Sequence, residues 1–260
     1  MNKAFTAFKE YYKFSKAKKG VILAGSLVFY LLLGIVPYFY VAAEICKVLE
    51  INFDSFSEIL ASYVGGDTVK YIIDSSNVNT AGENIIFLAL TLYSSATLFY
   101  YLKRIGETLY VAERQKSFVM VRIWSIVVMF IIQILIVVFG AVNISINSAI
   151  RGKPILKVIT FCLTALFIFG ALLIINKFVC PTKNKIKDIY AGSLFTTAHW
   201  IIFTTGFTFY VKYFANFTRL YGALSFIVIF LIWLYLLMQG LVSGVVINVY
   251  KSVKKNLSQN

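Results

Sequence analysis

Apolar runs of about 20 residues recur along the chain, and this recurrence constrains its fold more than any other feature. A helix needs about 20 residues to cross a bilayer core of ~30 Å. Hydrophobic residues make up 60% of the 260 residues, whereas soluble domains hold roughly 45–50%. Mean hydropathy is +0.81. Because so few polar residues cannot cover a soluble globule, the chain is predicted to be a polytopic membrane protein.

The runs predict an all-α fold with six transmembrane helices, at about residues 21–46, 84–102, 121–147, 156–178, 189–214 and 221–250. Backbone groups in lipid must be hydrogen-bonded within the segment, which favours helices. Strict alternation, the mark of β-barrel strands, is lacking. We expect one membrane domain over residues 21–250, between a basic amphipathic N-terminal segment (1–20) and a basic C-terminal tail (251–260).

The positive charges predict the orientation in the membrane. Most of the 25 Lys and Arg residues fall in the two termini and in the loops after the second and fourth spans, with Lys103 and Arg122, at the ends of the neighbouring spans, counted in the first of these loops. Cytoplasmic loops collect Lys and Arg, so we expect both termini in the cytoplasm. This asymmetry largely explains the net charge of +14, and we expect no nucleic-acid partner.

Two segments outside the spans are predicted to be amphipathic. The first outer loop holds more than half of the 11 acidic residues, and helical spacing relates its apolar residues Phe53, Phe56, Ile59, Leu60 and Tyr63. We expect small amphipathic helices there, over the outer mouth, as a lid or as a solvated connector. In the N-terminal segment, Phe5, Phe8 and Tyr12 share a face among lysines, which predicts an interfacial helix that binds anionic lipid.

Polar side chains inside the spans are the candidates for a substrate cavity, because polar groups are costly within a membrane. Six are predicted to line it: Tyr93, Ser94, Thr97, Thr196, His199 and Gln239. His199 is the only histidine and lies near the middle of the fifth span. A neutral imidazole needs hydrogen-bond partners, which suits substrate binding, proton relay or a structural role. The alternative for all six is hydrogen bonding between helices.

Small residues on the sixth span predict a helix-packing face. Gly222, Trp233, Gly240 and Gly244 fall on one side of the helix, and the last two form a GxxxG pattern that permits close backbone approach. We expect packing within the monomer, and the sequence leaves homo-oligomerisation open. In the first span, Pro37 removes a backbone hydrogen bond and is predicted to kink the helix.

Sequence signatures of catalysis are lacking. The three cysteines are widely spaced without a CxxC motif, so we expect no disulfide framework, metal or cofactor. Metal-dependent nucleases need clustered His, Asp and Glu ligands, whereas the only histidine here lies within a span. Walker A, HExxH and nucleophile-elbow motifs do not occur. We therefore expect no enzyme activity, and ribonuclease activity in particular is disfavoured.

Several short motifs carry a resemblance to a known family. They are Leu220-Tyr-Gly-Ala-Leu224, Trp233-Leu-Tyr235, Gly244-Val-Val-Ile-Asn248, Phe29-Tyr30 before Pro37, and Cys180-Pro181 before Ala191-Gly192-Ser193. With these motifs the chain resembles the YihY/BrkB family of bacterial inner-membrane proteins, formerly labelled ribonuclease BN-like. The resemblance implies six helices, cytoplasmic termini and a multi-pass location in the bacterial cytoplasmic membrane. The chain departs from the family pattern at Val246, where an acidic residue is expected.

Together these features favour a transporter or a permease for a lipid or solute of unknown identity. The alternative is a non-transporting envelope scaffold or lipid-organising protein. Either function has membrane lipids as partners, with anionic lipid at the basic cytoplasmic segments. A polar cavity across several helices favours translocation, and a dry bundle favours a scaffold. For a transporter, we expect His199→Ala to lower transport while the protein stays folded.

Overall fold

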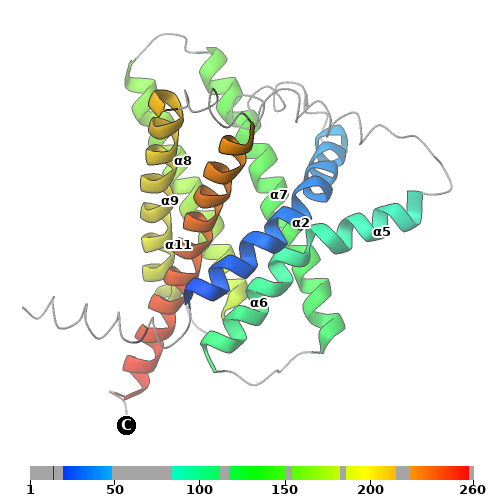
Figure 1. Cartoon of the computed structure of the whole chain (residues 1–260), viewed down its shortest axis with the longest axis vertical. Helices are drawn as coiled ribbons and strands as arrows, with labels where there is room; N and C mark the ends of the chain where they lie inside the picture. Colours follow the sequence, from blue (N-terminus) through cyan, green and yellow to red (C-terminus); the bar gives the residue numbers. More distant parts are fainter. Residues whose placement is uncertain are drawn as a thin grey trace, which may run out of the picture. The chain divides into compact units, whose positions relative to one another are not determined.

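The structure, a computed structural model, describes residue 14 and residues 20–48, 84–111, 117–149, 154–181, 186–214 and 223–257. The helices in these ranges are α2 (Gly20–Val48), α5 (Asn84–Ser95), α6 (Thr97–Leu109), α7 (Phe118–Ala149), α8 (Pro154–Val179), α9 (Ile186–Phe214) and α11 (Ala223–Leu257) (Figure 1). Within the described residues there is no strand, which confirms the all-α fold. The predicted helices of the first outer loop, most of the N-terminal segment, and Gly222 lie outside the described residues.

Five of the predicted spans correspond to single helices with small differences at their ends. The largest of these differences is in α11, which continues to Leu257 beyond the predicted end at 250. The second span, predicted as one helix over 84–102, begins at residue 84 as predicted, but its predicted end and its continuity are wrong. The structure has two helices there, α5 and α6, with Ala96 between them and α6 continuing to Leu109.

Hydroxyl groups flank the interruption at Ala96 and bond to backbone carbonyls of α5. Ser95 Oγ donates to the Thr91 carbonyl oxygen at 2.7 Å, and Thr97 Oγ1 donates to the Tyr93 carbonyl oxygen at 2.8 Å. Such bonds from a side chain to the carbonyl four residues earlier compete with the helical backbone ladder and bend helices. The same bonds occur in the continuous helix α9, at Ser193, Thr196 and Thr197, so they accompany the turn at Ala96 but do not by themselves account for it.

Other helix ends follow standard chemistry. Ser117 precedes α7, and its Oγ accepts a hydrogen bond from the Met120 backbone N–H at 3.3 Å, as an N-cap does. Pro154 opens α8, where its missing N–H costs nothing. After α6, Val111 has a φ of 53°, the left-handed conformation that commonly ends helices.

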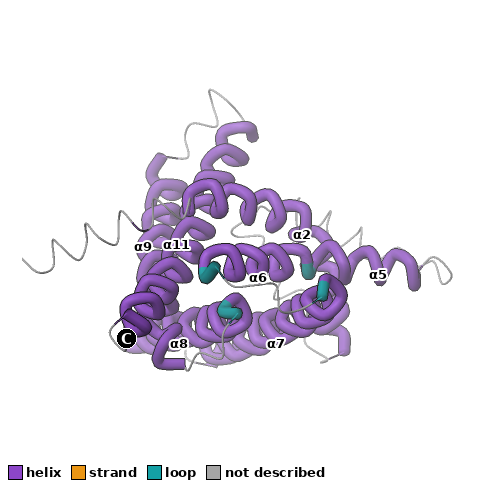
Figure 2. Tube along the Cα trace, turned by 90° about the horizontal axis from the view of Figure 1, so that it is seen from below, coloured by secondary structure: helices purple, strands orange, loops and turns teal. Residues whose placement is uncertain are grey.

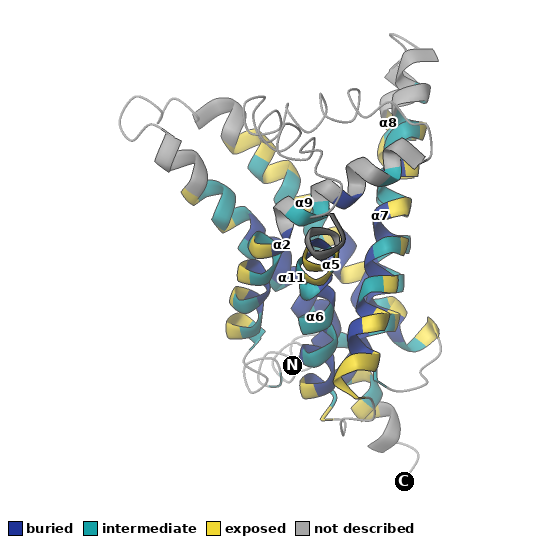
Figure 3. Ribbon diagram, turned by 90° about the vertical axis from the view of Figure 1, so that its right-hand side faces the viewer, coloured by how far each residue is buried: buried dark blue, intermediate teal, exposed yellow. Residues whose placement is uncertain are grey.

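Three helices are long and apolar enough to cross a membrane, judging only the described residues. The stretches are Phe118–Asn143 in α7, Val158–Val179 in α8 and Val228–Lys254 in α11. Along α7, buried positions such as Met129 and Gln133 alternate with exposed apolar ones such as Ile131 and Ile134 (Figure 3). An apolar exposed face beside a buried face that holds polar groups is what a lipid-facing helix needs. The described chain is thus built as a multi-pass membrane protein.

The chain forms two compact units. Unit 1 comprises the described residues within 1–29, 102–115 and 168–260, and unit 2 those within 30–101 and 116–167. In unit 1, α9 and α11 lie side by side along much of their length (Figures 1 and 2). In unit 2, α5 packs on α7. The single membrane domain over 21–250 stays a prediction.

The first helix meets two partners in unit 2. A Cβ added to Gly34 would lie 3.2 Å from the Ser94 carbonyl oxygen, so α2 passes close to the end of α5. Farther along α2, the Tyr38 carbonyl oxygen accepts a hydrogen bond from Gln133 Nε2 of α7. Pro37 lies inside α2, which continues helically to Val48, and its kink stays a prediction.

Candidate functional site

A buried arginine lies beside the α5–α6 interruption in unit 2. Arg122, one turn into α7, has only 9% of its surface exposed. Its guanidinium carbon lies 3.9 Å from the ring centre of Tyr93, 4.3 Å from that of Tyr100 and 5.9 Å from that of Phe118. Its Nη1 donates to Thr97 Oγ1 at 3.3 Å. We call Arg122, Tyr93, Thr97 and Tyr100 the Arg122 site.

In the Arg122 site, two predicted cavity residues contact an arginine that the sequence placed among the charges of a cytoplasmic loop. Tyr93 and Thr97 were predicted to line a cavity, and both contact the guanidinium. Ser94, the third candidate of the predicted second span, is half-buried on α5, and its carbonyl faces Gly34 of α2. Arg122 was counted as a loop charge because it stands at the edge of the predicted span. The sequence feature that could have identified Arg122 as a site residue is its position in the first turn of an apolar helix, because a charge there needs a partner.

The other cavity candidates belong to unit 1, where the structure shows two of them at the contact between α9 and α11. Thr196 Oγ1 donates to the Gly192 carbonyl oxygen at 2.9 Å and lies 3.3 Å from the Gly240 carbonyl oxygen. His199 Nε2 lies 2.9 Å from the Leu236 carbonyl oxygen. Since a carbonyl only accepts, Nε2 carries a proton and donates it to this bond.

The indole of Trp200 extends this row of contacts. Its Nε1 donates to the Leu237 carbonyl oxygen at 2.8 Å, one residue beyond the acceptor of His199. Three polar side chains within two neighbouring turns of α9, those of Thr196, His199 and Trp200, therefore contact the α11 backbone. Gln239, the last cavity candidate, is half-buried on α11.

Glycines make the close approach of α9 and α11 feasible. A Cβ at Gly240 would overlap the imidazole of His199, and one at Gly244 would overlap Thr196 Oγ1 and the Gly192 carbonyl oxygen. A Cβ at Gly192 would in turn overlap the Gly244 carbonyl. The GxxxG residues thus pack against α9 within the monomer. Trp233 is half-buried on α11 and stacks with Phe207 of α9 at 4.9 Å between ring centres.

A buried amide network joins α8, α9 and α11 within unit 1. Asn248 Oδ1 accepts a hydrogen bond from the Gly192 backbone N–H at 2.7 Å, and its Nδ2 donates to Asn176 Oδ1 at 3.3 Å. Asn176 Nδ2 donates to Ser193 Oγ at 3.0 Å. Asn248 and Ser193 both belong to motifs that carry the family resemblance. Because their polar groups satisfy one another, these motifs act as structural connections between helices.

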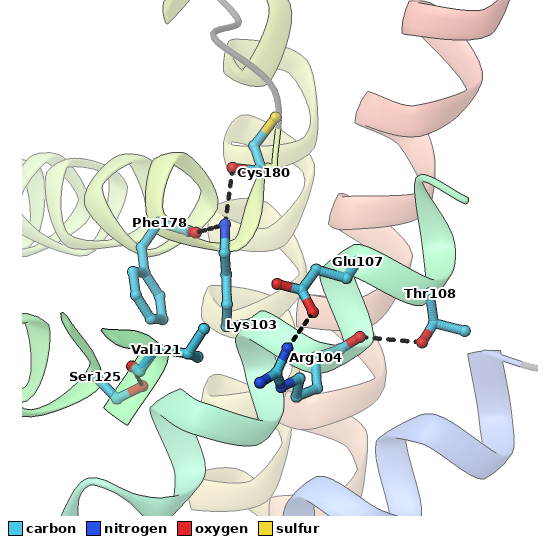
Figure 4. A network of polar contacts seen from close by, with 8 residues as sticks. All are labelled: Lys103, Arg104, Glu107, Thr108, Val121, Ser125, Phe178 and Cys180. Atoms are coloured by element: carbon cyan, nitrogen blue, oxygen red, sulfur yellow. Dashed lines mark hydrogen bonds and ion pairs between the residues drawn. The ribbon is translucent and has the colours of Figure 1, made fainter. Parts of the chain in front are cut away.

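A lysine of α6 forms hydrogen bonds with the end of α8 (Figure 4). Lys103 Nζ donates to the Phe178 carbonyl oxygen at 2.8 Å and to the Cys180 carbonyl oxygen at 3.1 Å. A cation at a helix C-terminus satisfies its last carbonyls and complements the helix dipole. Beside it, Arg104 forms an ion pair with Glu107 at 2.7 Å. Lys103, which was also counted as a loop charge, therefore caps α8.

The same region holds a tyrosine whose titration is suppressed. Tyr110 follows α6, and burial raises the pKa of its phenol, with further contributions from the neighbouring Cys180 and Asp188. Its hydroxyl is protonated at physiological pH and is available as a hydrogen-bond donor. Among the described residues, no group of three or more His, Cys, Asp and Glu side chains has the geometry to hold a metal ion.

Comparison with known proteins identifies the relatives of the chain. It is 24% identical over 268 residues to the putative ribonuclease-like protein YfkH of Bacillus subtilis, covering 96% of each chain. It is 35% identical over 98 residues to a UPF0761 membrane protein of Coxiella burnetii, covering 37% of this chain and 35% of that one. A UPF0761 membrane protein of Prosthecochloris aestuarii is 25% identical, over 86% of this chain and 56% of the relative.

The lengths covered differ among these relatives. The chain spans nearly all of YfkH but about a third of the Coxiella protein and just over half of the Prosthecochloris protein. No solved structure matches the chain. The family model described as virulence factor BrkB matches residues 12–259, which is nearly the whole chain. Together with the apolar helices, this match shows that the chain is a membrane protein that belongs to the BrkB family.

Proposed function

We propose that this protein is a permease that moves a lipid or a solute across the bacterial cytoplasmic membrane. The observation that carries the proposal is the turn at Ala96 that divides the second span into α5 and α6, with the buried Arg122 beside it. The turn is local, because the Ala96 N–H still donates to the Leu92 carbonyl and the Ala96 carbonyl still accepts from the Tyr100 N–H. Membrane helices are interrupted where backbone is buried in protein or lines a cavity, and transporters place their binding sites at such breaks.

The side chains around the interruption support this proposal. Ser95 and Thr97 direct their hydroxyls to carbonyls of α5, and Arg122 stands beside Thr97. A buried arginine at the start of an apolar membrane helix is costly without an anionic partner, and such a residue suits the entrance of a substrate or ion pathway. Hydroxyls and an arginine at one helix break therefore favour translocation.

The second candidate function is a non-transporting scaffold, and the packing of unit 1 favours it. Thr196, His199 and Trp200 hydrogen-bond backbone carbonyls of α11. At their glycines α9 and α11 approach so closely that no cavity fits between them. A closely packed interface of this kind suits a rigid bundle, so a transport pathway would have to lie elsewhere in the protein.

Reconstitution tests the permease proposal. The full chain is placed in liposomes of phosphatidylethanolamine and phosphatidylglycerol. Lipid movement is followed with fluorescent phosphatidylglycerol and dithionite quenching. Solute movement is followed by mass spectrometry of compounds lost from liposomes loaded with a bacterial metabolite extract. Protein-free liposomes are the baseline, and we expect one assay to exceed it severalfold.

A matched pair of variants links the activity to the helix interruption. Thr97→Val removes the hydroxyl that donates to the carbonyl four residues earlier and accepts from Arg122, whereas Thr208→Val removes only the bond to the earlier carbonyl, at an exposed position of α9. We expect the first variant to slow transport severalfold and the second to leave it unchanged. Activity equal to protein-free liposomes in both assays would favour the scaffold.

We also propose that the chain is not a ribonuclease, although the name of its relative YfkH suggests one. The only histidine of the sequence is hydrogen-bonded to an α11 carbonyl inside a membrane helix pair, and so it is not placed as a general base for RNA. Purified protein incubated with labelled RNA and divalent metal is expected to cleave no faster than a mock purification. Cleavage that copurifies with the protein would contradict this proposal.

A further inference from the structure

We propose that the Arg122 site binds the phosphate group of an anionic phospholipid. The site lies in unit 2, where α7 begins beside the interruption between α5 and α6. Its centre is a buried guanidinium, its walls are the rings of Tyr93 and Tyr100, and its floor is Thr97 Oγ1.

The charge of Arg122 lacks a counterion among the residues that the structure describes. A guanidinium carries five N–H donors. The described part of the chain supplies an acceptor for one of them, Thr97 Oγ1, and Nε is buried without any partner. A buried cation without a hydrogen-bonded anion is costly. A bound oxyanion would offset that cost by accepting the remaining donors.

The aromatic walls leave the donors available for an anion. Tyr93 and Tyr100 contact the guanidinium with their ring faces, at 3.9 and 4.3 Å from the ring centres. Aromatic rings attract a cation but are weak hydrogen-bond acceptors, so these contacts leave the strong N–H donors of Arg122 without an anion. Phosphate and carboxylate oxygens bind a guanidinium in bidentate geometry. The arrangement therefore matches an oxyanion and disfavours a cation.

The surroundings favour a lipid as the source of that oxyanion. The site stands at the beginning of the apolar stretch Phe118–Asn143, the depth at which phospholipid phosphates lie. Tyr93 is 49% exposed and Phe118 is 53% exposed, so the rim of the site is open. Beside it, the apolar side chains Val119 and Ile123 are also exposed, and they offer a surface for acyl chains.

The identification of this lipid as cargo rests on the proposed permease function, whereas the binding itself does not. A lipid that binds but is not moved would be a structural or regulatory ligand of the same site. The binding experiment is therefore carried out in detergent, where transport is not measured.

Native mass spectrometry of the full chain measures the binding. The delipidated protein is titrated with dioleoylphosphatidylglycerol, with the zwitterionic dioleoylphosphatidylcholine, and separately with glycerol 3-phosphate as a soluble phosphate. The variants are Arg122→Gln, Tyr93→Leu and a control of equal charge loss, Lys187→Gln, at an exposed position of α9. Tyr93 is itself half exposed, so its replacement tests the site even where the arginine variant does not fold.

We expect the wild type to prefer phosphatidylglycerol over phosphatidylcholine. Affinity is expected to fall about tenfold in Arg122→Gln, the usual scale of a lost charge-assisted hydrogen bond. It should fall severalfold in Tyr93→Leu and much less in Lys187→Gln, which measures the general attraction of a basic cytoplasmic segment for anionic lipid. Saturable binding of glycerol 3-phosphate, lost with Arg122, would instead assign the site to a soluble phosphate and overturn the lipid assignment.

Equal affinity of the wild type for both phospholipids would overturn the proposal, as would equal losses in Arg122→Gln and Lys187→Gln. Failure of the permease proposal is distinguishable from failure of the site. If Arg122→Gln loses phosphatidylglycerol binding but the wild type moves no lipid or solute in liposomes, only the transport proposal is refuted. If the wild type transports but shows no binding that depends on Arg122, only the site is refuted.

Discussion

Replacement of Gly244 by alanine tests the packing of α9 against α11. A Cβ at this position would overlap Thr196 Oγ1 and would lie 2.6 Å from the Gly192 carbonyl oxygen. Backbone cannot swing aside as a side chain does, so the two helices must move apart. The movement would stretch the bonds that Thr196, His199 and Trp200 make to α11.

The expected magnitude follows from three contributions. Overpacking costs roughly 1–3 kcal/mol, and each stretched hydrogen bond loses up to about 1 kcal/mol. Higher helix propensity returns about 1 kcal/mol. The net loss is about 2 kcal/mol, which corresponds to a melting temperature lower by roughly 4–8 °C for a chain of this size.

The assay is the thermal loss of the monodisperse peak in size-exclusion chromatography, at one heating rate because detergent-solubilised proteins unfold irreversibly. The control is Gly206→Ala on α9, where a Cβ would meet nothing within 4 Å. Gly206→Ala is expected to melt at or above the wild-type temperature. If Gly244→Ala matches that control, the close contact between α9 and α11 is wrong.

Three further variants test the other polar contacts by the same thermal assay. Asn248→Ala removes the acceptor of the Gly192 N–H and the donor to Asn176 Oδ1, which should destabilise the protein by about 1–3 kcal/mol; an unchanged melting temperature would contradict the network. Trp200→Phe keeps an aromatic ring but removes the Nε1 donor to α11, so the free energy of unfolding is expected to fall by about 1 kcal/mol. An unchanged melting temperature would argue against that bond. Lys103→Met removes the cap of α8 and should cost about 1 kcal/mol, whereas the exposed Lys187→Met should not; equal effects would refute capping.

The structure changes the interpretation of His199. The sequence allowed a substrate-binding role, a proton relay or a structural hydrogen bond. The contact of its Nε2 with the Leu236 carbonyl and of its ring with the Gly240 position now accounts for the residue structurally. His199→Ala would lose that bond and leave a void, so reduced transport in this variant must be compared with its melting temperature before a role in transport is assigned.

The sequence by itself determined the class of the protein and most of its helices. Apolar runs of this length have one stable arrangement in a bilayer, which is why the all-α fold and the approximate bounds of α7, α8 and α9 were predictable. The spacing of Gly240 and Gly244 likewise predicted a packing face, because glycine on a membrane helix permits backbone contact.

Only the tertiary structure decided what the polar residues contact. Thr97 and Arg122 are 25 residues apart, and Lys103 lies 75 residues from the Phe178 carbonyl that it caps. Hydrophobic periodicity describes how one helix divides its faces, but it does not name the neighbour that each face meets. Charges at the ends of spans therefore appeared as loop charges until the structure brought Arg122 to two tyrosines and Lys103 to the end of α8.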